Sequence, residues 1–149
     1  MKKIVVLLSL VSILSGCGST KKTVTVCTGE YAGFTSTSEY AAEGDNVVSY
    51  KETILYRFEE FQIDETDEAA KDAILQAVRE ENNATEFEGL VIEEEIVQDG
   101  FQLTYFLDFT KADMKKVMEM GLIEEDTIKI SLEKTISMAE DDGFTCVTE

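Results

Sequence analysis

The chain has 149 residues, of which 44% are hydrophobic and 30% charged, a composition typical of one domain with a packed core. It contains no histidine, and 31 acidic residues against 13 basic ones give a net charge of −18. Catalysis by histidine and metal binding by histidine are therefore excluded. Nucleic-acid binding is disfavoured, because neutralising phosphates requires a basic surface.

The first seventeen residues have the pattern of a bacterial export signal. A basic start at residues 1–3 precedes an apolar stretch, residues 4–14, that is too short to span a bilayer. The Leu-Ser-Gly-Cys tetrapeptide at 14–17 then resembles the lipobox of bacterial lipoproteins. The resemblance implies that the chain is cleaved after Gly16 and that Cys17 carries a diacylglycerol lipid with palmitate-type chains. Such a lipid would be a stable membrane anchor. The alternative is that residues 4–14 form an ordinary buried helix.

These features predict three parts of the chain: a signal peptide over residues 1–16, a lipidated tether over 17–22 and a single domain over 23–149. The signal carries two lysines and no acid, so the mature chain has 11 basic and 31 acidic residues and a net charge of −20. Five extended tether residues reach at most about 18 Å. We therefore expect the domain to lie close to the cell membrane, on its extracytoplasmic face.

The remaining two cysteines, Cys27 and Cys146, lie near opposite ends of the predicted domain. An exported protein folds in an oxidising compartment, so we predict a disulfide between them. In the chain-entropy model a loop of this length contributes up to about 4–5 kcal/mol. The alternative is a pair of buried free thiols.

Alternating polar and apolar residues predict the first three strands. Residues 23–28 alternate threonine with valine, and residues 31–42 and 47–58 flank the loop Gly44-Asp45-Asn46. We expect a three-residue hairpin loop with Asn46 in the left-handed conformation. This register pairs Ala42 with Val48 and places Glu52 directly opposite Ser38.

A second hairpin is predicted by Asp99-Gly100, a strong turn signal between two apolar runs. In the corresponding register Glu94 lies across from Tyr105. A helix is predicted over residues 65–82, capped by Asp64 or Thr66. A short helix is predicted from 114 to Gly121, with Thr110 and Asp113 as its capping box. A third helix is predicted over 131–142. Residues 144–147 return as a strand beside 23–28. The order predicts an α+β fold, a mainly antiparallel sheet of two hairpins plus terminal strands, with three helices packed on one face.

The whole pattern resembles the YehR-like family of small bacterial lipoproteins. The resemblance is carried by the lipobox at 14–17, by Gly44-Asp45-Asn46 with the long strand after it, and by the closing helix from Ser131-Leu132 into Gly143-Phe144. It covers most of the mature chain and implies the fold and the membrane address given above. It brings no activity and no catalytic or ligand residue.

Two acidic residues occupy positions where the strand pattern calls for apolar ones. Glu52 and Glu94 lie on the apolar faces of their strands, where a carboxylate is costly unless it is paired or hydrogen-bonded. Ser38 and Tyr105 supply hydroxyl donors opposite them. We interpret these four residues as a candidate pocket for a cation or a cationic group. The alternatives are a bulge, an edge position, or two locally satisfied acids on a partly exposed face.

The sequence favours a non-enzymatic binding or interaction module. No catalytic residue, cofactor or specific metal site is indicated, since the acidic run at 64–68 lacks the glycine of a calcium loop. The acidic surface suits a basic protein, a cationic peptide or a divalent cation, although solubility alone also explains it. The alternative functions are an envelope-polymer hydrolase that uses paired carboxylates, or a purely structural envelope lipoprotein.

Counting thiols on the mature protein tests the assignment of the cysteines. We expect no free thiol before reduction and two after it, because the lipid blocks Cys17 and the disulfide joins the other two. Two free thiols in the unreduced protein would rule out the disulfide, and a third thiol after reduction would rule out the lipid.

Overall fold

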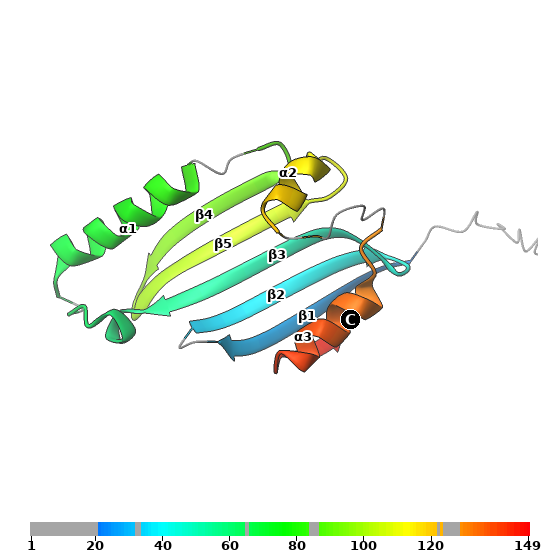
Figure 1. Cartoon of the computed structure of the whole chain (residues 1–149). Helices are drawn as coiled ribbons and strands as arrows, with labels where there is room; N and C mark the ends of the chain where they lie inside the picture. Colours follow the sequence, from blue (N-terminus) through cyan, green and yellow to red (C-terminus); the bar gives the residue numbers. More distant parts are fainter. Residues whose placement is uncertain (1–20, 32–33, 65, 84–86, 122, 124–128) are drawn as a thin grey trace, which may run out of the picture.

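The computed structural model describes residues 21–149 apart from 32–33, 65, 84–86, 122 and 124–128, so the predicted signal peptide and Cys17 lie outside the described residues. The described chain forms an antiparallel sheet with helices, which confirms the predicted α+β fold (Figure 1). The elements in chain order are β1 Lys22–Tyr31, β2 Phe34–Glu43, β3 Asn46–Arg57, the short 3-10 helix η1 Phe58–Phe61, α1 Glu68–Asn83, β4 Leu90–Val97, β5 Gly100–Asp108, α2 Met114–Glu119, α3 Leu132–Asp141 and β6 Thr145–Thr148.

The six strands are ordered β4-β5-β3-β2-β1-β6, and every neighbouring pair is antiparallel. The last strand lies beside the first, as predicted. Cys27 and Cys146 occupy directly paired positions on β1 and β6, and they form a disulfide, which confirms the predicted pairing. The bond closes a loop over a sequence separation of 119 residues.

The β2–β3 hairpin has the predicted register over most of its length, including the pair Ser38 and Glu52. It differs at the turn, where Ala42 pairs with Val47 and a β-bulge follows. The left-handed residue is Gly44, with φ 63°, whereas Asn46 already belongs to β3. The prediction for Asn46 was therefore wrong, because glycine adopts positive φ without the steric cost that asparagine bears.

The β4–β5 hairpin turns one residue earlier than predicted. Val97 pairs with Gly100, so the turn residues are Gln98 and Asp99, and Glu94 faces Leu103 instead of Tyr105. A Cβ atom on Gly100 would collide with the carbonyl oxygen of Tyr56. This glycine therefore serves the close approach of β5 to β3. Each side chain keeps its predicted face, because the register differs by two residues.

The three helices pack on one face of the sheet, as predicted. We call it the helix face and define it by Ala42, Glu52, Leu107 and the residues paired with them. On this face Val117 of α2 joins a buried cluster with Leu90 and Leu107, and Leu132 of α3 joins one with Ala42 and Val47. Figure 1 shows α1 beside β4 and α3 over β1, while Leu132 at the start of α3 reaches the turn end of β2 and β3. No helix in the described part of the chain is long and apolar enough to cross a membrane.

Two of the predicted helix caps were assigned to the wrong residues. Helix α1 begins at Glu68, where the Asp67 carboxylate accepts a hydrogen bond from the backbone N–H of Ala70, while Asp64 bonds to Thr66 in the preceding turn.

Helix α2 is capped by Asp113, which accepts from the backbone N–H of Lys115, whereas Thr110 bonds to Asp108. In both helices the aspartate immediately before the first helical residue acts as the cap.

Asp45 joins the β2–β3 turn to the start of α3. Its Oδ1 accepts hydrogen bonds from the backbone N–H of Glu133, at 3.0 Å, and from the Ser131 hydroxyl, at 3.1 Å. Its Oδ2 accepts from Lys129 at 2.9 Å, and its carbonyl oxygen accepts from the backbone N–H of Leu132. The bond from Glu133, followed by that from Lys129, lowers the pKa of the Asp45 carboxyl to about 2. The turn therefore supplies a second cap for α3 besides Ser131.

Replacing Asp45 by asparagine should destabilise the protein in a pH-dependent manner. The folded pKa lies below the ordinary value, so the contribution of the carboxylate is complete above about pH 4 and disappears as the pH falls towards 2. We expect the urea midpoint of Asp45→Asn to lie below that of the wild type at pH 7 and to converge with it at pH 2.

The matched variant Asp141→Asn makes the same charge change on the exposed last turn of α3. It should shift the midpoint less than Asp45→Asn does at pH 7. A constant difference between wild type and Asp45→Asn from pH 7 to pH 2 would contradict the assigned role of the carboxylate.

Candidate ligand-binding site

Glu52 lies in the middle of the helix face, on the central part of β3. Ser38 of β2 is its partner on one side and Tyr105 of β5 is its partner on the other. Directly paired residues point to the same face of a sheet, so the structure brings three of the four predicted site residues into one row across three strands.

The Glu52 carboxylate accepts a hydrogen bond on each oxygen. The Ser36 hydroxyl donates to Oε1 at 2.9 Å, and the Tyr50 phenol donates to Oε2 at 2.7 Å. Ser36 and Ser38 are both buried, with 6% and 5% of their surface exposed, so small side chains make room for the acid between larger ones. These bonds offset the cost of placing a half-buried carboxylate on an apolar face.

We call Glu52 and its two donors, Ser36 and Tyr50, the Glu52 cluster. Tyr50 stacks on Tyr40, and this pair of rings extends the cluster along the helix face. The rings of Tyr40 and Tyr50 are directly paired across β2 and β3, with centroids 5.2 Å apart. Burial, and then the negative charge of Glu52, raise the pKa of the Tyr50 phenol above its ordinary value. Burial also raises the pKa of Tyr40. Tyr50 therefore keeps its proton at neutral pH and acts as the donor to Glu52.

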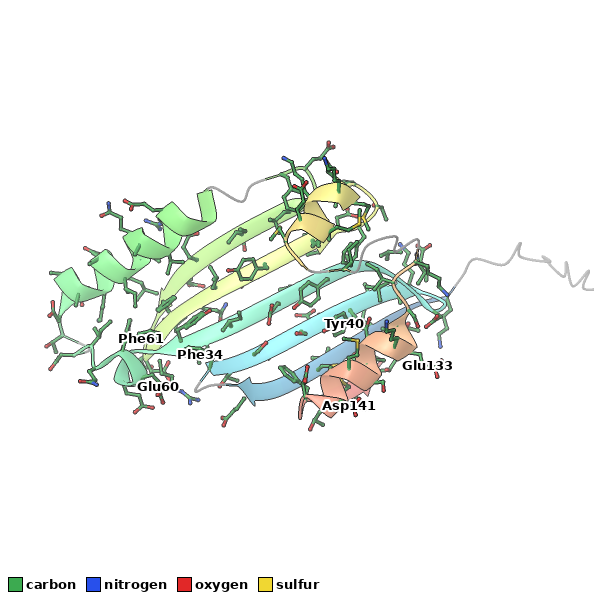
Figure 2. All side chains as sticks on the ribbon, in the orientation of Figure 1. Phe34, Tyr40, Glu60, Phe61, Glu133 and Asp141 are labelled. Atoms are coloured by element: carbon green, nitrogen blue, oxygen red, sulfur yellow. A yellow bond between two sulfur atoms is a disulfide. The ribbon has the colours of Figure 1, made fainter. Side chains whose placement is uncertain are left out.

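A partly open cavity of about 180 Å³ lies next to these tyrosines. Its walls come from the sheet, from α3 and from the segments on either side of α2. The lining residues are Tyr40, Val47, Tyr50, Leu107, Phe109, Ile123, Ile130 and Thr135. The cavity is mostly apolar, and Tyr50 is the residue that both lines it and contacts Glu52. Figure 2 shows Tyr40 on the sheet, beside α3.

Glu94, the fourth predicted residue, does not join this cluster. It lies on the edge strand β4 and faces Leu103, one row further along the sheet than Glu52. Its carboxylate forms an ion pair with Arg79 of α1, with Nε and Oε1 2.9 Å apart. The apolar strand position is therefore compensated by a helix residue that the strand pattern could not indicate.

The sequence analysis missed the cavity and the role of Tyr50. Tyr50 precedes Glu52 by two residues, so the alternation of the strand already placed both on one face. The remaining lining residues lie far apart in the chain, and no local pattern connects them.

The opposite face of the sheet has a hollow of about 250 Å³, which is more open to solvent. Lys51, the cation in its lining, is already paired with Glu39, with Nζ and Oε1 3.0 Å apart. Within the described residues no group of three or more cysteine, aspartate or glutamate side chains is placed to hold a metal ion. The Glu52 cluster with its cavity is therefore the strongest candidate site.

Two proteins of known structure share this fold. A protein from Streptococcus pneumoniae TIGR4, solved by NMR, matches with a TM-score of 0.58 and 21% identity, over 99% of this chain and 98% of that chain. The E. coli YehR protein, also solved by NMR, matches with a TM-score of 0.66 and 17% identity, over 87% of this chain and 94% of that chain. No family model and no curated protein matches the sequence. The resemblance to the YehR-like family is thus supported at the level of the fold.

Removing the Tyr50 hydroxyl should destabilise the protein more than removing that of Tyr40. In Tyr50→Phe the half-buried carboxylate loses a donor, which costs roughly 1–3 kcal/mol. Tyr40→Phe removes a phenol that lies near the neutral Ser38 hydroxyl, so we expect a smaller loss. Urea unfolding of both variants measures the difference. Equal losses would show that the bond between Tyr50 and Glu52 has no special weight.

Proposed function

We propose that this protein is a non-enzymatic binding module that is anchored to the extracytoplasmic face of the bacterial cell membrane through lipid on Cys17. Its ligand carries a small organic cation, whose charged group is held by Glu52 while its apolar part occupies the adjacent cavity. The observation that carries the proposal is a hydrogen-bonded carboxylate beside an apolar cavity on an otherwise apolar strand face.

The bonds from Ser36 and Tyr50 use one acceptor site on each oxygen of the Glu52 carboxylate. A carboxylate has about four lone-pair sites, and Ser36 and Tyr50 account for two of them here. An ammonium group has three donors and a charge opposite to that of Glu52. A cationic ligand would therefore complete the hydrogen bonding of the site.

The size of the cavity limits the ligand. At about 180 Å³ the cavity is smaller than the roughly 300–1,000 Å³ typical of drug-sized ligands. Its aliphatic and aromatic walls favour a short hydrocarbon portion. These features support a small alkylammonium compound, or one such group at the end of a longer molecule.

Ligand-dependent stability tests this site. The full mature lipoprotein, in neutral-detergent micelles, would be melted with butylammonium, with its neutral counterpart butanol, and with calcium or magnesium at fixed ionic strength. At ten times Kd, mass action stabilises the folded state by about 1.4 kcal/mol, which raises the midpoint by roughly 3–6 °C. We expect this rise with butylammonium, and we expect Glu52→Gln to abolish it.

Glu94→Gln is the matched control, because it makes the same change on the same face beyond the cluster. It should leave the rise with butylammonium intact. A rise that survives Glu52→Gln, or equal rises with every cation tested, would reject the proposed site and indicate surface screening instead.

A further inference from the structure

Four aromatic side chains form a cluster at the end of the helix face where η1 follows β3. The ring of Tyr56 lies 4.5 Å from that of Phe34 and 4.6 Å from that of Phe101, measured between centroids, so three neighbouring strands contribute a continuous row. Phe61 of η1 lies over this row, 6.0 to 6.4 Å from each of the three rings. We call these four residues the aromatic cap. Figure 2 shows Phe34 and Phe61 together at this end.

Phe61 leaves part of its ring in solvent. It is 40% exposed, whereas Phe58, one turn earlier in the same short helix, is 1% exposed. Phe58 already has a cation over its ring, since Lys71 Nζ lies 5.3 Å from its centroid. Phe34 and Tyr56 are only half-buried, so the exposed surface of Phe61 continues onto its neighbours. An aromatic surface of this kind attracts cations through the negative faces of its rings.

The chain around the aromatic cap is strongly acidic. Residues 57–72 contain two basic residues: Arg57, the residue just before η1, and Lys71, which is buried and paired with Glu68. The same stretch contains seven acids, namely Glu59, Glu60, Asp64, Glu65, Asp67, Glu68 and Asp72. Glu59 and Glu60 are exposed and directly precede Phe61 in η1, and Figure 2 shows Glu60 beside this end of the sheet. Aromatic rings flanked by carboxylates complement a planar, positively charged group.

We propose that the aromatic cap is the docking site for an arginine-rich segment of a partner protein. A guanidinium group stacks its flat face on the ring of Phe61 while its N–H groups bond to the carboxylates of Glu59 and Glu60. Arginine fits better than lysine, because its planar fork satisfies a ring and a carboxylate at the same time.

The position of the cap also suits a partner, provided that the proposed membrane anchor on Cys17 exists. Lys22, the first residue of β1, lies at the opposite end of the sheet, next to Glu43. A ten-residue strand spans about 30 Å, so the cap would face away from the lipid surface. At the anchor end, residues 108–119 carry three lysines and three acids, whereas residues 57–72 carry two basic residues and seven acids.

Fluorescence anisotropy with the full mature lipoprotein in neutral-detergent micelles tests this docking site. The probe is a fluorescein-labelled octapeptide of alternating glycine and arginine, and its counterpart has citrulline in place of each arginine. We expect the arginine peptide to bind about tenfold more tightly than the neutral one. Phe61→Leu keeps the apolar bulk but removes the ring, and it should weaken binding about fivefold. The loss of its ring contacts should lower the melting midpoint only slightly, so the variant remains folded at the assay temperature.

The two carboxylates are tested by the double variant Glu59→Gln, Glu60→Gln, which should weaken binding and reduce its salt dependence. Glu133→Gln with Asp141→Asn, both on α3, removes the same charge elsewhere and should change affinity by less than about twofold. An equal loss of affinity in the α3 control would show that the peptide is attracted only by the overall negative charge, and this result would overturn the proposal. Full affinity in Phe61→Leu, or no preference for arginine over citrulline, would also overturn it.

Two further variants separate this site from the proposed function. Glu52→Gln and Cys17→Ser should both bind the arginine peptide with unchanged affinity, whatever they do to alkylammonium binding or to anchoring. A loss of peptide binding in Glu52→Gln would place the peptide in the Glu52 cavity and reject the aromatic cap as the site.

Discussion

The bond between Cys27 and Cys146 holds the last strand of the chain against the first. Strand β6 has four residues and pairs with β1, and on its own such a short edge strand would be weakly held. The disulfide adds up to about 4–5 kcal/mol in the chain-entropy model. Helix α3 ends at Asp141, and Gly143 lies in the short connection to β6, so fixing the strand also restrains the end of the helix. The other end of α3 is held by Asp45, and between these two attachments the helix forms one wall of the cavity.

The helix face changes its chemistry from row to row along the strands. The aromatic row of Phe34, Tyr56 and Phe101 is followed by a row with Ser36, Ile54 and Leu103, and next by the row of Ser38, Glu52 and Tyr105. The stacked tyrosines and Leu107 complete the face at the cavity. Each row lies about 7 Å from the next, because side chains on one face recur every two residues. The two proposed sites therefore lie along the same face of the sheet but involve different side chains.

The large negative charge is distributed unevenly over the molecule. It is densest around η1 and the start of α1, whereas the described residues near the first strand carry lysines paired with acids, such as Lys22 with Glu43 and Lys129 with Asp45. Mutual repulsion among acids destabilises a compact chain, so a concentration of acids at one end has an energetic cost. A cationic partner bound at that end would offset this repulsion. If the acids served only solubility, they would not need to be concentrated at one end.

Local sequence patterns determined the strands and helices, the side of the sheet that each side chain occupies, and the pairing of the two cysteines. These features depend on alternation, which is a short-range property, and on having two cysteines left to pair. The tertiary structure alone decided the exact turns and the composition of the site. Gly100 pairs with Val97 because it must approach the carbonyl oxygen of Tyr56, and Glu94 is neutralised by Arg79 from a helix fifteen residues earlier. The cavity likewise combines residues from positions 40 to 135, and only the packing of α3 on the sheet brings them together.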